Sequence, residues 1–325
     1  MGRHHAGLPR PSERIFKKSD ILDTLASVDT DKDARGRVLR LETEFRRRVQ
    51  GHLESLPLSD AKLKKFNTNP FVLLIHSFHR GYAGIAEIEA DILPAKLFSS
   101  METSAGRMVE AVMLPEYGWE CVASEMHSTN SALDGRYLHG DVLKLATLKS
   151  GPRCLNDEMS ENFADTIIGN AIIWAGEGSV QKIDFTYGVL YGTQKLSNKK
   201  DWHILRNIRE KLSRTELTRQ PDDRWDCAFK KGDVEVEVRV RVGSDWWTYL
   251  GGPNCLVEMC AALIRACVRP RESDSRDHRY TIADLADIVS TDIVPEDYNV
   301  SLLQRSQFEW LFFVARHFCD VLRNE

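Results

Sequence analysis

The sequence predicts an α/β protein with a mixed central sheet flanked by helices on both sides. The clearest indication is the segment 234–242, VEVEVRVRV, in which valines alternate with charged residues as in a half-buried strand. A second indication is a hairpin pattern over 133–149, where Val142, Lys144, Ala146 and Leu148 would share one face. A third is the alternation of apolar strands with helical patterns elsewhere. We also expect N-terminal and C-terminal helical additions.

The first part of the chain is expected to be basic and then helical. Residues 1–19 carry five basic residues against one acidic residue, which indicates a basic arm. Apolar residues recur at three- and four-residue steps over 38–53 and predict a long helix. The arginine triplet at 46–48 is interpreted as part of its solvated face.

The next region is less clear in type. Residues 71–75, FVLLI, are interpreted either as a strand or as the start of a buried helix. Residues 84–98 predict a helix broken at its proline. A separate helix is expected over 101–113, capped by Thr103 or Ser104.

The remaining elements are expected in a regular order. They are a strand at 118–126, a helix over 157–175 capped by Asn156, a strand at 183–191, and helices near 202–214, 255–268, 281–290 and 301–322. We divide the chain into an N-terminal arm and helical segment (1–65), a central domain (66–269) and a C-terminal helical extension (270–325).

The composition is that of an ordinary globular protein, with 42% hydrophobic and 28% charged residues and a net charge of −4. It excludes a collagen-like chain, a disordered polyanion and a small disulfide scaffold. No run of 18 apolar residues and no apolar leader is visible, and the seven cysteines are scattered. We therefore expect a cytoplasmic protein without a membrane partner. The cysteines at 255, 260 and 267 fit an apolar helix better than a zinc site.

Several common catalytic motifs are absent from the sequence. There is no GxxxxGK[ST], HExxH, GxSxG or EF-hand loop. The informative stretch is 99–156, which holds Glu110, Asp134 and Lys149. An aspartate and a lysine on adjacent hairpin strands can point into one cleft, an arrangement that suits metal-assisted phosphodiester hydrolysis. A turn aspartate and a solvated lysine are the alternative interpretation.

The order of four segments resembles the type II restriction endonucleases of the PD-(D/E)XK superfamily. These segments are TSAGRMVE (103–110), LDG (133–135), LATLKSGPRCLN (145–156) and YGVLYG (187–192). The chain is most similar to the subgroup that cuts RGGNCCY sites, with an NPF segment at 69–71 and an aromatic pair at 246–247 in corresponding positions. The likeness covers roughly residues 65–268.

The resemblance implies a restriction-endonuclease-like fold and a set of site residues. Asp134 would be the central metal ligand, Lys149 the catalytic lysine, Leu148 a metal ligand through its backbone carbonyl, and Glu110 a second carboxylate. Thr147 stands where the family carries an acid and cannot supply a charge. Either Glu110 replaces the missing charge, or the metal is bound more weakly, or the motif lies in another register. Asp141 is the competing acid, and it fits a hairpin turn better. Mg²⁺ is the implied cofactor, with Mn²⁺ able to substitute.

A basic segment is the expected site of DNA contact. Residues 182–219 contain nine Lys and Arg against four Asp and Glu, and base contacts favour Arg, Lys, Asn and Gln on a loop. The residues that we expect to touch DNA are Gln194, Lys195, Asn198, Lys199 and Lys200, with Ser150 and Arg153 on the backbone of the cleaved strand. Trp246 and Trp247 are expected in the core or at a dimer contact rather than stacked on bases.

The sequence thus predicts a Mg²⁺-dependent, site-specific endonuclease for double-stranded DNA that leaves 5′-phosphate ends. A homodimer is expected because a two-fold DNA site calls for two-fold protein symmetry. A cognate DNA methyltransferase would be its functional partner in restriction-modification, without physical contact. Two alternatives stay open: a different PD-(D/E)XK nuclease of repair or of a mobile element, and a catalytically decayed DNA-binding protein.

Overall fold

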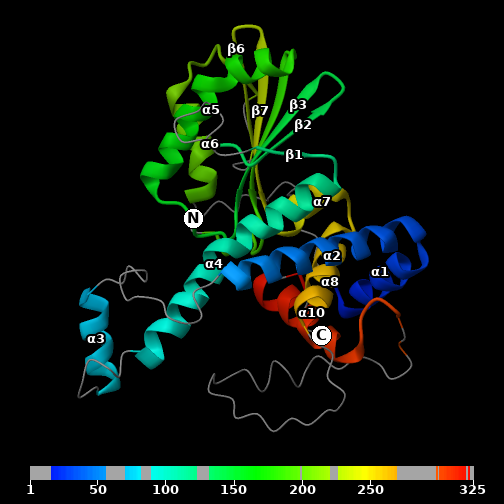
Figure 1. The fold of residues 1–325 in the computed structure, drawn as a ribbon. Helices are drawn as coiled ribbons and strands as arrows, with labels where there is room; N and C mark the ends of the chain where they lie inside the picture. Colours follow the sequence, from blue (N-terminus) through cyan, green and yellow to red (C-terminus); the bar gives the residue numbers. More distant parts are fainter. Residues whose placement is uncertain are drawn as a thin grey trace, which may run out of the picture.

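The computed structural model describes residues 16–55, 70–81, 89–122, 132–197, 200–219, 226–268, 298, 300–319 and 321–322 (Figure 1). The described helices are α1 (Lys18–Thr30), α2 (Lys32–Ser55), α3 (Pro70–Arg80), α4 (Glu89–Glu116), α5 (Asp157–Gly178), α6 (Lys200–Lys211), α7 (Ser244–Gly251), α8 (Cys255–Cys267), α10 (Arg305–Phe313) and the π-helical turn η3 (Val314–Phe318). The strands are β1 (Glu120–Cys121), β2 (Gly135–His139), β3 (Val142–Lys149), β4 (Lys182–Val189), β5 (Leu217–Arg219), β6 (Asp226–Lys231) and β7 (Val234–Val242).

The seven strands form one mixed sheet in the order β1-β2-β3-β4-β7-β6-β5. Strands β3, β4 and β7 are parallel, and antiparallel strands extend the sheet on both sides. The predicted alternation in β7 is confirmed, because its five valines are buried while Glu235 and Glu237 are exposed. The expected α/β class with a mixed sheet flanked by helices is therefore correct.

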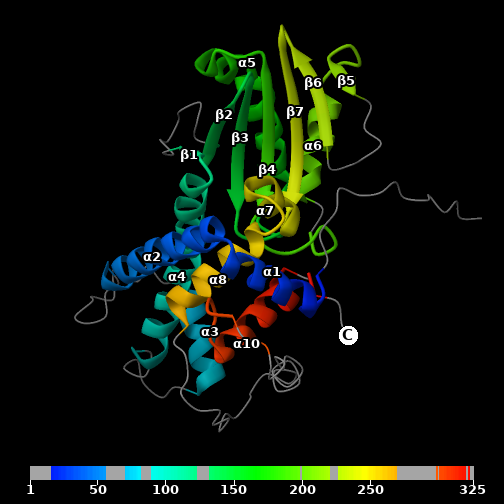
Figure 2. The ribbon, with the colours of Figure 1, turned by 90° about the vertical axis from the view of Figure 1, so that its right-hand side faces the viewer.

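Helices α5 and α6 cover one face of the sheet (Figures 1 and 2). Their apolar residues pack with those of β3, β4, β6 and β7 into one core cluster, in which the Trp174 and Phe185 rings stack with centroids 5.9 Å apart. Asn156 caps α5 as predicted, since its side chain accepts a hydrogen bond from the Met159 amide at 2.8 Å.

A helical layer lies at the carboxyl ends of β3, β4 and β7. Helices α1, α2, α8 and α10 share a second core cluster with α4 and α7. Trp246 and Trp247 are buried in it, and the Trp247 indole donates to the Leu190 carbonyl at 2.8 Å, so both belong to the core as expected. None of the described helices has the length and apolar character needed to cross a membrane.

A buried charge pair joins the N-terminal helices to this layer. Arg37 of α2 donates two hydrogen bonds of 2.7 Å to Glu258 of α8, and the Tyr117 hydroxyl donates a third at 2.9 Å. Glu258 is only 2% exposed. A buried carboxylate without its cation is strongly destabilising, so this contact holds α2, α4 and α8 together.

Some expected elements differ in the structure. Helix α4 runs through Pro94 without a break, and Thr103 does not cap a new helix, because its hydroxyl donates to the Ser99 carbonyl one turn earlier. Residues 71–75 belong to a helix, α3, but four of their side chains are more than half exposed rather than buried. Elements α1, α7, β5 and β6 were not expected, because short or weakly periodic segments carry little sequence signal.

Other expectations are confirmed, and two fall on segments outside the described residues. The hairpin β2–β3 forms, and the arginines at 46–48 pair with Glu42 and Glu44 on the exposed face of α2. Cys255 and Cys260 are buried in the apolar helix α8. The basic arm up to residue 15 and the helix expected at 281–290 lie outside the described residues.

The Arg37–Glu258 pair gives a first prediction. Arg37→Met should lower the free energy of unfolding by about 3 kcal/mol, because it leaves Glu258 buried without a cation. Arg40→Met removes an arginine of the same helix that is paired with Glu116 but 63% exposed, so it should change stability little. Urea unfolding monitored by circular dichroism measures both, and equal effects would contradict the role given to the buried pair.

Candidate active site

Three loops that follow the parallel strands meet at one edge of the sheet. The loop after β4 is tied to the end of β3, because the Leu190 amide donates to the Lys149 carbonyl at 2.9 Å and the Tyr191 amide to Ser150 at 3.2 Å. The Gly243 amide, after β7, donates to Val189 at 2.8 Å. In open α/β sheets, ligands bind at the carboxyl ends of the parallel strands, which makes this edge the place to look for a site.

Asp134 is held at this edge by the backbone of β3. It directly precedes β2, and its amide donates to the Ala146 carbonyl at 2.8 Å. Its carboxylate accepts a 2.6 Å hydrogen bond from the Leu148 amide. In a strand, the N–H and C=O of one residue point to the same side. The Leu148 carbonyl therefore also faces Asp134.

Thr147 supports this arrangement and has no charge to offer. It is 1% exposed, and its hydroxyl donates to the carbonyl of Ala132, two residues before Asp134. Thr147 and the Leu148 amide thus hold the segment from Ala132 to Asp134, which leads into β2. Thr147 is a positioning residue in this geometry.

Glu110 of α4 completes a carboxylate pair with Asp134. Burial, together with the negative charge of Asp134, raises the pKa of Glu110 to about 8, against the opposing positive charges of Lys149 and Arg107. Burial also raises the pKa of Asp134, against the lowering effects of the Leu148 amide, Lys149 and Arg107. The two acids and two cations are therefore close enough to interact electrostatically.

Lys149 ends β3 and lies on the face of the sheet that α5 covers. Its ammonium lies over the Phe163 ring, 5.9 Å from the ring centroid. It is half-buried, and its charge acts on both Glu110 and Asp134. The structure thus brings together Glu110, Asp134 and Lys149, which come from three separate elements.

The glycine at position 106 lets α4 approach the end of β3. A Cβ atom at Gly106 would lie 2.2 Å from the Ser150 hydroxyl oxygen and 3.9 Å from a Glu110 carboxylate oxygen. Ser150 therefore borders the same spot as Glu110.

The oxygen donors at this edge fit a hard divalent cation. Mg²⁺ in proteins is commonly held by one or two carboxylates, with water and substrate phosphate completing its shell. Glu110, Asp134 and the Leu148 carbonyl supply such donors, and a cation between the acids would relieve the repulsion that raises the pKa of Glu110. No cluster of three or more His, Cys, Asp or Glu suited to a metal occurs among the described residues. The set is one acid short, at Thr147.

The residues expected to touch DNA differ in how far they are exposed to solvent. Lys195 is exposed, and Arg153 is exposed while donating to the Leu196 carbonyl at 3.4 Å. Gln194 is only 5% exposed, so its side chain does not lie on the surface. Lys200 starts α6 and pairs with Asp157 of α5. Asn198 and Lys199 lie outside the described residues.

Acids of neighbouring elements neutralise part of the basic segment. Lys211 pairs with Asp165 at 2.7 Å and with Glu161 at 3.3 Å, both on α5. Lys182 pairs with Asp141 at 3.1 Å. The positive field over 182–219 is therefore weaker than the sequence count suggests. Asp141, the competing acid, is an exposed turn residue in this ion pair.

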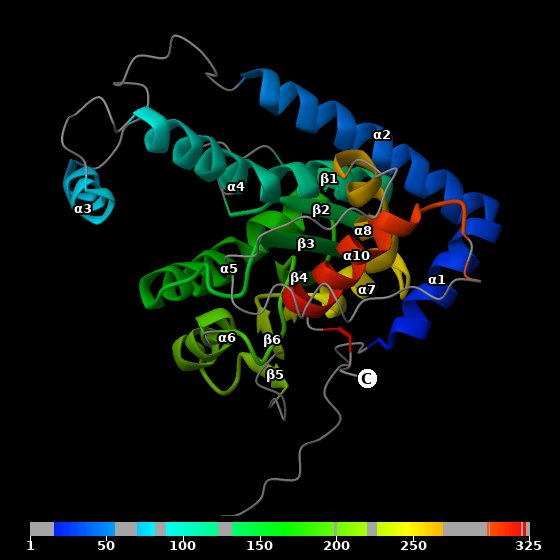
Figure 3. The same cartoon turned by 90° about the horizontal axis from the view of Figure 1, so that it is seen from below.

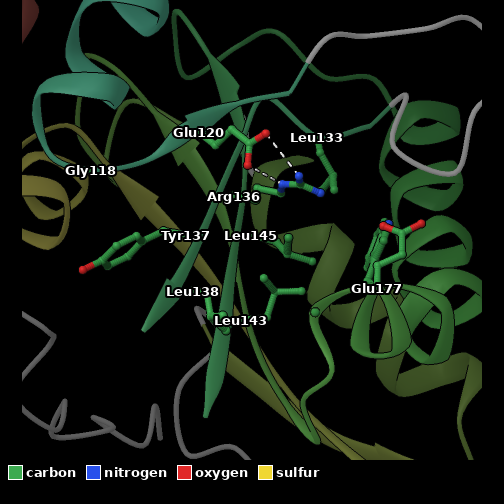
Figure 4. A pocket seen from close by; sticks show the side chains of 11 residues that line it. Gly118, Glu120, Leu133, Arg136, Tyr137, Leu138, Leu143, Leu145 and Glu177 are labelled. Carbon is green, nitrogen blue, oxygen red and sulfur yellow. Dashed lines mark hydrogen bonds and ion pairs between the residues drawn. The ribbon is translucent and has the colours of Figure 1, made fainter. Parts of the chain in front are cut away.

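A pocket of about 440 Å³ is lined by Leu133, which precedes Asp134 in the chain, and by residues of β2, β3 and α5 (Figure 4). Leu143, Leu145 and Trp174 are among its apolar lining residues. Arg136 and Glu120 face each other at its rim, joined by hydrogen bonds of 2.8 and 3.1 Å. Because Glu120 engages the guanidinium, the pocket is not a ready phosphate site, and neither Glu110 nor Asp134 lines it.

Two residues of the site were missed from the sequence. Arg107 lies one helical turn before Glu110, and its charge lowers the pKa of both Glu110 and Asp134. The spacing of three residues on a helix was a usable signal. Tyr187 of β4 is fully buried, and its hydroxyl finds no hydrogen-bond partner within the described part of the chain. Burial, and after it nearby negative charges that include Asp134, raise the pKa of Tyr187. No sequence pattern indicates that Tyr187 lies near Asp134.

Comparison with known proteins gives no assignment. The chain matches no protein-family model and no curated protein sequence.

The raised pKa of Glu110 predicts a pH-dependent gain in stability on its removal. The folded state keeps this proton up to about pH 8, whereas an unperturbed glutamate loses it near its ordinary pKa of 4.5. The folded state therefore binds more protons in this window, and its stability falls as the pH rises. Glu110→Gln should be more stable than the parent by roughly 1–4 kcal/mol at pH 8 and about equal at pH 4.5.

The control for this prediction is Asp141→Asn. Pairing with Lys182 lowers the pKa of Asp141, so its removal should bring no gain between pH 5 and pH 8. Metal-free denaturant titrations across this range measure both variants. A Glu110→Gln advantage that stays constant with pH would refute the assigned burial of this carboxyl.

Close contact between the loops after β4 and β7 makes any side chain at position 243 destabilising. Its φ is +55°, and a Cβ atom there would lie 2.2 Å from the Gly192 carbonyl oxygen. Gly243→Ala should lower the unfolding free energy by roughly 2–4 kcal/mol. Gly140 in the β2–β3 turn has a similar φ of +60° with open space around it, so Gly140→Ala should cost only about 1 kcal/mol. Thermal and urea unfolding compare them, and equal losses would argue against a crowded edge.

Proposed function

We propose that the protein is a metal-dependent, site-specific endonuclease for double-stranded DNA that produces 5′-phosphate ends. The observation that carries the proposal is the meeting of Glu110, Asp134 and Lys149 at the carboxyl ends of the parallel strands. These are the positions to which the resemblance assigns two carboxylates and the catalytic lysine. They are separated in sequence, so their convergence is an independent argument for the site.

The charges of the site suit phosphodiester hydrolysis. Mg²⁺, when bound, would neutralise charge on the phosphate and polarise its oxygens. Glu110, Asp134 and the Leu148 carbonyl would hold it. The Lys149 ammonium would stabilise negative charge as water attacks the phosphorus and the 3′ oxygen leaves. Arg107, on the same helix as Glu110, is placed to bind the phosphate that enters.

Contacts with DNA are proposed at the rim of this edge. Ser150 beside Gly106, together with the exposed Arg153 and Lys195, would contact the backbone of the cleaved strand. Gln194 would read a base only after its side chain leaves its buried position. A homodimer would cut both strands of a two-fold site.

Thr147 favours a second candidate function. It is uncharged and buried where an acid would strengthen the metal site, as in a nuclease fold that has kept DNA binding and lost cleavage. Such a protein would bind DNA without cutting it in Mg²⁺ or in Mn²⁺. The pair of Glu110 and Asp134 argues for the active form.

Digestion of a sequenced phage genome with Mg²⁺ tests the proposal. The wild type should give discrete fragments with 5′-phosphate ends at one recurring site. Asp134→Asn and Lys149→Met should cut at least about 1,000-fold more slowly, because each removes a charge that acts on the reacting phosphate. Both should still retard the site-bearing fragment on a gel.

Asp141→Asn is the matched control for this experiment. It removes the competing acid in the surface ion pair with Lys182, and it should cut like the wild type. If Asp134→Asn cut DNA at the wild-type rate, the proposed role of Asp134 in the active site would be wrong. Binding without cutting by the wild type would favour the decayed form, and structure-dependent nicking would favour a repair enzyme.

A further inference from the structure

A stripe of apolar side chains is exposed along α3. Phe71, Leu74, Ile75 and Phe78 follow the spacing i, i+3, i+4 and i+7, so they share one helix face. Their exposed fractions are 71%, 68%, 70% and 91%. A face of this kind normally packs against a partner.

The first half of α4 carries two further exposed apolar side chains. Phe98 is 68% exposed and Met101 is 37% exposed, and they are also three residues apart on one helix. We call α3 and the first half of α4 the apolar arm. The arm stands away from the sheet and from helices α1, α2, α8 and α10 (Figures 1 and 3).

The size of the exposed surface matches a protein interface. Val72 is also more than half exposed, so seven large apolar side chains of the arm face solvent. With roughly 100 Å² exposed on each, they present about 700 Å², close to the ~800 Å² that each partner buries in a stable complex. Large apolar side chains that gather on exposed surface commonly mark a site of protein interaction. A helix of 11 residues also gains little stability by itself in water.

We propose that the apolar arm is the homodimer interface and that its partner is the arm of a second copy of this chain. The stripe carries no charge, so two identical stripes can meet about a two-fold axis without like-charge repulsion. A membrane surface is a poorer fit, because interfacial helices pair their apolar face with a polar face rich in Lys and Arg. Arg80 is the only Lys or Arg in α3. The proposal does not depend on nuclease activity.

Sedimentation velocity without DNA or metal tests this interface. The wild type should be a dimer at micromolar concentrations. The double variant Ile75→Glu/Phe78→Glu should raise the dissociation constant at least about 100-fold, because two charges would be buried against each other. Ile172→Glu is the control, since it places the same charge at a 54% exposed apolar position on α5 and should remain dimeric.

A second measurement covers the case in which the double variant does not fold. Hydrogen exchange of wild-type residues 71–78 should slow as the protein concentration rises and the arm becomes covered. A monomeric wild type, including one that binds lipid vesicles, would overturn the proposal. So would a double variant that dimerises normally, or exchange that is independent of concentration. Each of these results leaves the DNA cleavage assay as a separate test.

Discussion

Two carboxylates share a half-buried position between α4 and the end of β3, and this constraint explains much of the structure around them. Burying two like charges together is costly, and it raises the pKa of Glu110 to about 8. The fold offsets this cost locally: Lys149 and Arg107 bring positive charge, and the Leu148 amide donates to Asp134. A bound cation would relieve this repulsion, which agrees with the proposed metal-dependent activity.

Several other features of the fold position the carboxyl-terminal edge of the parallel strands, where the two carboxylates lie. The parallel strands β3, β4 and β7 end together, and their loops approach closely at Gly192 and Gly243. The glycine at 106 brings α4, and with it Glu110, against Ser150. The end of the same helix is held in turn by the helical layer, through Tyr117, Glu258 and Arg37. The buried pair far from the carboxylates therefore helps to position one of them.

Strong local patterns were predictable from the sequence. The alternating valines of β7, the hairpin β2–β3 and the Asn156 cap are decided by neighbours in the chain, and each was expected. The unbroken helix through Pro94 was not, because a proline usually ends or kinks a helix and only the structure shows that α4 continues. For the site, the resemblance indicated Asp134, Lys149 and Glu110, whereas the contributions of Arg107 and Tyr187 depend on contacts across elements. The ion pairs that weaken the basic segment join residues more than 40 positions apart, as Lys211 and Asp165 do, and no local pattern encodes them.

Calorimetric titration with Mn²⁺ in two buffers of different ionisation enthalpy tests whether Glu110 and Asp134 form one cation site. Binding should be accompanied by proton release near pH 7, because Glu110 holds its proton in the metal-free protein and must lose it to bind a cation. Glu110→Gln should abolish the proton release, and Asp134→Asn should abolish the binding. Binding of Mn²⁺ that is unchanged in both variants, or no binding by the wild type, would contradict a shared cation site.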